Sequence, residues 1–153
     1  MGKKIGFHVA DSIRMFQVFK LYARVNENNE FYVDGNLVFG IDERRVMVDF
    51  QNFEHTYEIF KLFGNHWGGW EQIPTAQSMY YIAKKWEQTY KAEIIDISKD
   101  SIEFHLDKEL SDKEIDELFE EIRGLHAESN YDGGFEKLRE IIKQEARFSI
   151  WWD

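Results

Sequence analysis

Apolar and polar residues alternate through much of the first 50 positions, which is the period of a β-strand with one buried face. One face of a predicted long strand carries five apolar residues: Met15, Phe19, Leu21, Ala23 and Val25. The polar run 26–29 predicts a turn, and alternation resumes over 31–39 and 46–50. The first part of the chain is therefore predicted to form an antiparallel meander.

Helical spacing of apolar residues begins after this region. Residues 54–63 predict a short helix that ends at Gly64, a residue type that favours the helix C-terminus. Thr75 is a typical N-cap for a second helix that runs to about Tyr90, because apolar residues recur there at three- and four-residue intervals. Residues 64–74 thus become an aromatic and glycine-rich loop between two regular segments.

The remaining residues mix the two periods. Residues 92–97 and 101–106 predict two short strands that pair antiparallel, and 111–114 (Ser-Asp-Lys-Glu) match a capping box at the start of an acidic helix. A further helix around 135–142 and a strand over 147–152 follow. Mixed sheet and helix predict an α+β fold, with an antiparallel sheet formed by the N-terminal meander and the C-terminal strands, packed with about four helices.

The length of 153 residues fits one domain with a single core. We expect a β-rich half over 1–63 and an α+β half over 75–153, joined by the 64–74 loop. No signal-peptide pattern and no apolar run of about 18 residues occurs, so a cytoplasmic protein without membrane contact is expected.

Composition removes several kinds of chemistry. The chain has no cysteine, which excludes disulfides, thiolate zinc sites and a cysteine nucleophile. The five histidines lack the spacing of a compact metal site, and no phosphate-binding glycine loop or nucleophile motif is present. We therefore predict no catalytic residue, no metal site, no cofactor and no enzymatic activity.

Charge is distributed unevenly. The net charge is −10, and residues 1–75 carry 10 acids against 8 bases, whereas residues 76–153 carry 19 acids against 11 bases. Binding to nucleic acid phosphates requires clustered lysine and arginine, so this balance argues against a nucleic acid partner. It permits either a basic protein partner or a simple role in solubility.

Two groups of residues are candidates for binding a partner. The first is the outer face of the acidic helix after Ser111: Asp116, Glu117, Glu120 and Glu121. The second consists of tryptophans in the 64–74 loop and at the chain end: Trp67, Trp70, Trp151 and Trp152. Each has a second interpretation, because the acids suit a solvated helix face, the loop can cover the core, and adjacent strand residues point to opposite faces.

Two other functions stay open. Glu103 and His105 fall on the same side of a predicted strand, and a pocket that unites them with Tyr80 or Tyr81 would suit a small-molecule-binding module or a small enzyme. In a self-associating structural domain, Trp67, Trp70 and Trp151 would be buried between copies.

From about residue 74 onward the chain resembles an uncharacterised bacterial family, domain of unknown function 4253. The resemblance is carried by Trp86 and Tyr90, the pair 92–93, the strand 100–104, the acidic helix, and the ending 148–153 (Phe-Ser-Ile-Trp-Trp-Asp). It implies a shared fold and a bacterial or phage origin, and it brings no established activity.

The chain departs from the family at two places. Lys91 stands where the family commonly has glycine, and residues 125–127 (Leu-His-Ala) stand near a common Cys-Pro-Asp tract.

The sequence alone thus predicts an acidic protein-interaction domain of the immunity or inhibitor kind. We expect it to neutralise a bacterial toxin or another nucleic-acid-acting protein, because a negative surface attracts a cationic one and exposed aromatics add lasting affinity. A basic toxin or nuclease is the expected partner, and the oligomeric state stays open.

Overall fold

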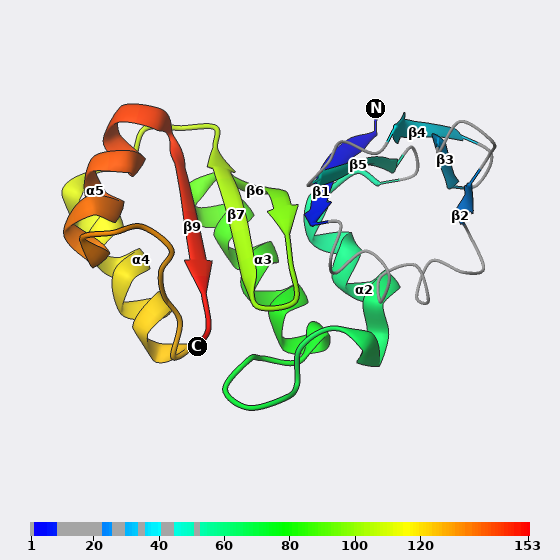
Figure 1. The fold of residues 1–153 in the computed structure, drawn as a ribbon. Coiled ribbons are helices and arrows are strands. Elements are labelled where there is room, and N and C mark those ends of the chain that lie inside the picture. The colour runs from blue at the N-terminus through cyan, green and yellow to red at the C-terminus, as the bar shows by residue number, and fades with distance from the viewer. Residues whose placement is uncertain (1, 9–22, 26–29, 34–35, 41–44, 51–52) are drawn as a thin grey trace.

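A six-stranded sheet forms the centre of the computed structural model, which describes residues 2–8, 23–25, 30–33, 36–40, 45–50 and 53–153 (Figure 1). In spatial order its strands are β5 (Arg45–Phe50), β1 (Lys3–His8), β6 (Ala92–Ile97), β7 (Ser101–Leu106), β9 (Arg147–Trp151) and β8 (Glu128–Ser129). Adjacent strands in this sheet pair antiparallel, except β1 and β6, which run parallel with Gly6 opposite Asp96. The sheet therefore joins the N-terminal and C-terminal parts of the chain.

A second, three-stranded sheet contains β2 (Ala23–Val25), β3 (Glu30–Val33) and β4 (Asn36–Gly40), all antiparallel. An antiparallel meander is confirmed, but the alternating run 31–39, predicted as one strand, is divided into β3 and β4, which pair with each other. Strand β5 leaves the meander to pair with β1. The earlier part of the predicted long strand, including Met15, Phe19 and Leu21, lies outside the described residues. Strand β1 was not predicted from the sequence, although its Ile5 and Phe7 alternate with polar or small residues.

The helical segments follow the predicted order. They are η1 (Thr56–Glu58), α2 (Ile59–Phe63), η2 (Gly64–His66), α3 (Ala76–Tyr90), α4 (Asp112–Gly124) and α5 (Gly134–Glu145). The short helix predicted over 54–63 is divided into η1 and α2, and Gly64 ends α2 at a φ of 53°. Strands and helices mixed along the chain confirm the α+β class.

Helix ends form where the sequence places capping residues. The Thr75 hydroxyl accepts a hydrogen bond from the Ser78 amide, and Ser111 and Glu114 form the predicted capping box at α4. Lys91 ends α3 at a φ of 55°, in the left-handed region that favours glycine. A glycine would adopt this conformation without the steric cost that a Cβ adds.

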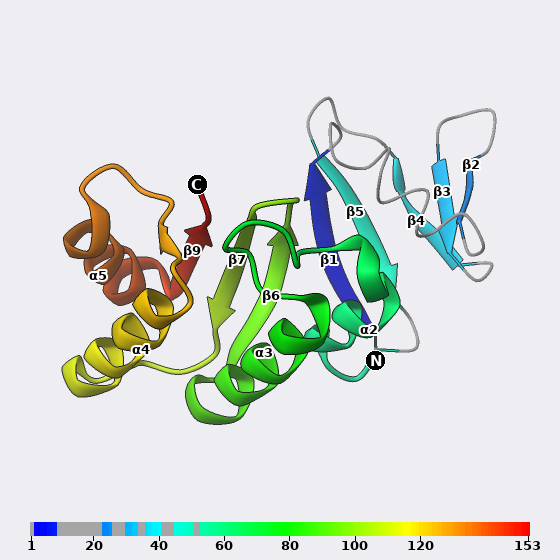
Figure 2. The ribbon, with the colours of Figure 1, turned by 90° about the horizontal axis from the view of Figure 1, so that it is seen from below.

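The core lies between the sheet and the layer that contains α2, α3 and α4 (Figure 2). Trp86 of α3 is fully buried and packs edge-on against Phe104 of β7 and Phe148 of β9, at centroid distances of 5.3 and 5.9 Å. Such aromatic contacts stabilise the layer through both buried area and ring geometry.

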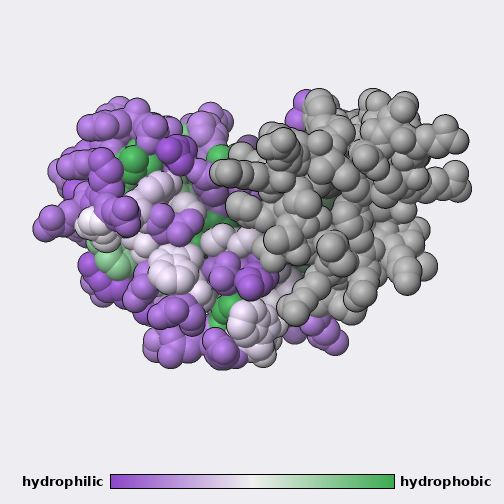
Figure 3. Space-filling view, in the orientation of Figure 1, coloured by the Kyte–Doolittle hydropathy of each residue, from purple (hydrophilic) through white to green (hydrophobic). Residues whose placement is uncertain are grey.

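The opposite sheet face is polar where β7 and β9 cross it. On β7, Ser101, Glu103 and His105 alternate with buried residues, whereas on β9 Arg147 is followed by three consecutive buried residues, 148–150. Figure 3 shows this face, on which hydrophilic residues predominate over the described part of the surface.

Candidate binding groove

A groove of about 630 Å³ opens between α2, the loop that follows it, and the first turns of α3. Rings of Phe60, Trp67, Tyr80 and Tyr81 contribute to its lining, together with the ammonium-bearing side chain of Lys61. Its volume is in the range of ligand-binding pockets, which are usually apolar with a few polar groups. No acid occurs among the lining residues that the structure describes, although 29 of the 153 residues are acidic.

Trp67 fixes one wall of the groove. Its side chain is 2% exposed, and its indole nitrogen donates a hydrogen bond of 2.8 Å to the Ser98 carbonyl in the β6–β7 turn. The ring packs edge-on against Phe60 at 5.1 Å and Trp152 at 6.1 Å. Of the two interpretations of the loop, binding a partner or covering the core, the second is therefore correct for Trp67.

Glycines close the loop behind Trp67. Gly68 has a φ of 67° and pairs with Thr75, and a Cβ at Gly68 would clash with the Pro74 carbonyl oxygen. The Gly69 amide donates to the Ile73 and Pro74 carbonyls at 3.1 and 3.0 Å. These contacts hold the groove wall in one conformation, which reduces the ordering cost of binding.

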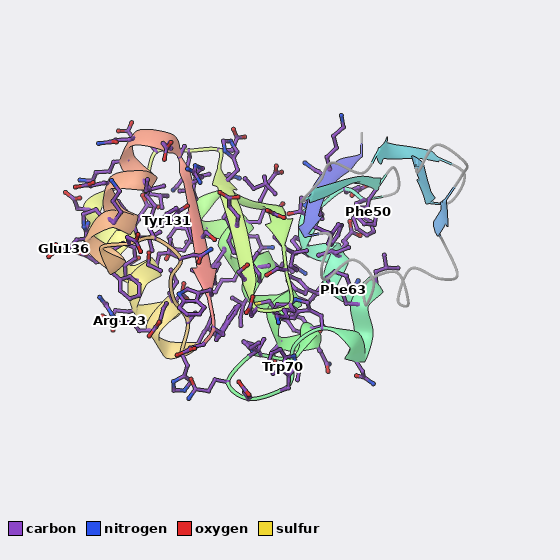
Figure 4. All side chains as sticks on the ribbon, in the orientation of Figure 1. Phe50, Phe63, Trp70, Arg123, Tyr131 and Glu136 are labelled. Carbon is purple, nitrogen blue, oxygen red and sulfur yellow. The ribbon has the colours of Figure 1, made fainter. Side chains whose placement is uncertain are left out.

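Two large apolar side chains stay exposed on this side of the fold. Trp70 is 44% exposed and Tyr81 is 61% exposed, and the structure places no other described large apolar side chain in the exposed class. Tyr81 is part of the groove lining, and Trp70 directly follows Gly69 on the loop between α2 and α3 (Figure 4). Exposed aromatic residues next to a formed groove are typical of a binding surface.

A row of aromatic contacts leads into the groove from η1. Tyr80 meets Tyr81 and Tyr57 edge-on at 5.2 and 5.1 Å, and the Lys61 ammonium lies 4.8 Å from the Tyr80 ring centroid. Tyr57 is stacked in turn on His55, whose Nδ1 lies 2.6 Å from a Glu87 carboxylate oxygen. Tyr57 thus packs against Tyr80, which packs against Tyr81, and Tyr81 remains at the surface.

Three lining residues were not predicted from the sequence as site residues: Lys61, Asn65 and Gln77. They line the groove because α2 and the start of α3 meet there, and no local pattern in the sequence marks such a meeting. The available signal was Tyr80 and Tyr81, two adjacent aromatics on a helix whose buried stripe already contained Met79, Ile82 and Ala83.

The acidic face of α4 is compensated by bases. Asp112 lies near Lys143 and Arg139, Glu114 near Lys108, Asp116 near Arg139, Glu117 near Lys113, Glu120 near Arg123, and Glu121 near Lys85. Six acids thus meet six bases, four of which come from outside α4. The hydrogen bond from Lys108 lowers the pKa of Glu114, and that from Lys143 lowers the pKa of Asp112.

Glu121 has a structural contact that the other predicted acids lack. Its carboxylate accepts a 2.9 Å hydrogen bond from the indole nitrogen of the buried Trp86 and also contacts Lys85, both on α3. Asp116, Glu117 and Glu120 are exposed at the surface. Glu121 therefore ties α4 to α3, whereas the other three acids occupy the helix surface.

The terminal tryptophans point to opposite faces, as predicted. Trp152 is 2% exposed, lies in the core, and donates from its indole nitrogen to the Leu125 carbonyl at 3.0 Å. Trp151 is partly exposed and donates to the Ser129 carbonyl at 3.1 Å. Trp67 and Trp152 were both predicted to contact a partner. Because both are buried in this chain's own core, they are not available for that contact.

A smaller polar hollow of about 240 Å³ lies on the sheet face opposite the helices. Glu103 lines it and accepts a 2.6 Å hydrogen bond from Arg147, which also donates to the Tyr131 hydroxyl at 3.2 Å. His105 is exposed and does not line the hollow, and Tyr80 and Tyr81 line the groove instead. The pocket expected to unite Glu103, His105 and these tyrosines is therefore not formed.

Among the described residues, no group of three or more His, Cys, Asp or Glu side chains has the arrangement of a metal site. No helix among the described elements is both long and apolar enough to cross a membrane.

A comparison with protein-family models matches residues 50–153 to Domain of unknown function (DUF4253). The matched range is more than half of the chain. The chain belongs to this family. The DUF4253 range begins at the last residue of β5, whereas the resemblance in the sequence begins at about residue 74. The range includes the groove and α4, and β1 lies outside it. No curated protein and no solved structure gives a significant match.

Proposed function

We propose that this DUF4253 chain is a protein-binding domain of the inhibitor kind that holds its partner at the groove between α2 and α3. The observation that carries the proposal is the exposure of Tyr81 and Trp70 beside a groove whose wall is already fixed by Trp67. Aromatic residues that insert into or frame a formed pocket supply much of the affinity in protein interfaces.

As the sequence suggested, we propose that the domain blocks a toxin or another nucleic-acid-acting protein. We no longer propose that the acids of α4 attract this partner, because the bases near Asp116, Glu117 and Glu120 offset their charge. Affinity is proposed to come from aromatic burial at the groove, with α4 outside the contact.

Site-specific photo-crosslinking in the native host tests this proposal. A benzophenone amino acid replaces Tyr81 in one variant and Glu136, an exposed residue of α5, in the matched control (Figure 4). We expect a cross-link to a different protein from position 81 and none from position 136. No cross-link, or the same product at both positions, contradicts the proposal, and a cross-link between two copies of this chain supports the self-associating alternative instead.

The captured protein is then titrated against purified variants. Trp70→Ala and Tyr81→Ala should each weaken binding by about tenfold or more, as truncated aromatic anchors do. The double variant Glu117→Gln, Glu120→Gln serves as the control on α4 and should leave the affinity within about twofold. If the double variant weakens binding more than Tyr81→Ala does, the α4 surface is the contact.

A further inference from the structure

Lys61 is the one charged residue among the described lining residues of the groove, in a chain that is acidic overall. Lys61 lines the groove, and Lys84 and Lys85 follow Tyr80 and Tyr81 by one turn on the same sides of α3. Lys85 reaches Glu121 of α4, whereas Lys61 lies over the Tyr80 ring. The first turn of α3 also lines the groove and adds the partial positive charge of a helix N-terminus.

The acid that precedes α2, Glu58, makes hydrogen bonds outside the lining of the groove. A carboxylate oxygen of Glu58 accepts hydrogen bonds of 3.0 Å from the backbone amides of Glu54 and His55, at the start of η1. Glu58 is absent from the described lining. A ligand in the groove thus meets aromatic rings, amide groups and one ammonium.

The rings set the shape of what can enter. Phe60 and Trp67 are buried, whereas Tyr81 stands open to solvent, so an incoming flat ring can replace water against Tyr81. Offset or edge-on contact between rings adds to the gain from buried area. A carboxylate beside that ring would face Lys61, and none of the described lining residues is acidic.

From these features we infer that the groove receives an aromatic side chain of the partner that is flanked by carboxylates, so that the docking segment is acidic. This inference rests on the protein-binding function proposed above and names the chemistry of the partner segment. It reverses the basic partner expected from the charge of α4, because the groove and not that helix provides the local field.

Short peptides test the ring and the charge separately. The probes are acetyl-Glu-Trp-Glu-amide, acetyl-Lys-Trp-Lys-amide and acetyl-Glu-Ala-Glu-amide, added to the ¹⁵N-labelled full chain and followed by amide chemical shifts. We expect the first to bind with a Kd of about 1 mM and at least about fivefold more tightly than the second, with shifts around Lys61, Gln77 and Tyr81. The alanine peptide should not approach saturation.

Three outcomes overturn the inference. They are binding of none of the peptides, equal or tighter binding of the lysine peptide, and shifts that map to α4 or α5 instead of the groove. Raising the salt concentration should reduce the preference for the glutamate peptide, since exposed charges are screened.

A charge reversal locates the preference. Lys61→Glu should abolish or invert it, whereas Lys113→Glu, which changes the net charge equally at an 85% exposed side chain on α4, should leave it unchanged. If both reversals act alike, the preference comes from overall charge and the inference is wrong.

The result separates this inference from the proposed function. Capture of a partner from position 81 together with a preference for the lysine peptide keeps the function and removes the acidic segment. Binding of the glutamate peptide without any captured protein keeps the ligand chemistry and removes the protein-binding function.

Discussion

The 64–74 loop and helix α4 both have a sequence composition typical of a binding surface, yet the fold places their side chains differently. In the loop, Trp67 is buried at 2% exposure while Trp70, three residues later, is 44% exposed. On α4, the acids that define its surface are each near a base, and three of the six bases, Lys85, Arg139 and Lys143, come from other helices. Composition thus identifies unusual segments, but the contacts decide which side chains remain available.

The largest expected difference lies within the loop itself. Trp67→Ala should lower the free energy of unfolding by about 3–5 kcal/mol, because it removes a buried ring and the hydrogen bond to Ser98. Trp70→Ala should change it by less than about 0.5 kcal/mol. Urea denaturation of both variants measures the two values, and similar losses would show that the loop does not have one structural and one exposed tryptophan.

Glycine replacements compare the backbone of the two regions. Gly68→Ala should cost about 2 kcal/mol or more, since its φ is 67° and the new Cβ meets the Pro74 carbonyl oxygen. Gly124→Ala, at the last residue of α4, meets nothing within 4 Å and should stabilise the fold by up to about 0.5 kcal/mol. Thermal unfolding gives the sign of each change, and a stabilising Gly68→Ala would contradict the closed loop.

Within α4, one acid should matter for stability. Glu121→Ala should cost about 1–3 kcal/mol because it leaves the buried Trp86 indole nitrogen without its acceptor, and Glu121→Gln should recover part of this loss. Glu117→Ala should stay within about 0.5 kcal/mol. Chemical denaturation of the three variants is the measurement, and equal effects of the two alanine variants would make α4 a uniform surface.

The smallest effect is the influence of the α4 acids on Tyr90. Burial, followed by the charges of Glu121 and Glu117, raises the pKa of Tyr90 to about 12. The pKa of Tyr90 is higher in the folded chain than in the unfolded chain, so the folded state binds the phenol proton more tightly. The free energy of unfolding should therefore be unaffected by this group below about pH 10 and should fall as the pH rises toward 12. Tyr90→Phe should remove that loss, and Glu117→Gln should lower the pKa in a spectrophotometric titration. An unchanged pKa in Glu117→Gln would mean that α4 exerts no field there.

Much of the fold could be predicted where local patterns are strong. The apolar stripe and Thr75 cap of α3 and the capping box of α4 give helices whose bounds the structure reproduces, because these signals act within a few residues. Strand β1 was missed, and its parallel pairing with β6 joins residues about 90 positions apart. No local signal specifies such a pairing.

The candidate site was predicted only as far as its loop. The sequence marked Trp67 and Trp70 as unusual without showing that one packs on Phe60 and the other stays exposed. Lys61 and Gln77 had no distinguishing pattern, and they become site residues because α2 and α3 meet at the loop.

The sequence by itself determined the α+β class, most helix and strand bounds, and the family to which the chain belongs, since periodicity, caps and residue identities are local properties. Tertiary structure decided which aromatic rings are buried, which charges are offset, and where a groove forms. Burial and charge pairing depend on neighbours that are distant along the chain, and these become neighbours only when the sheet and helices pack.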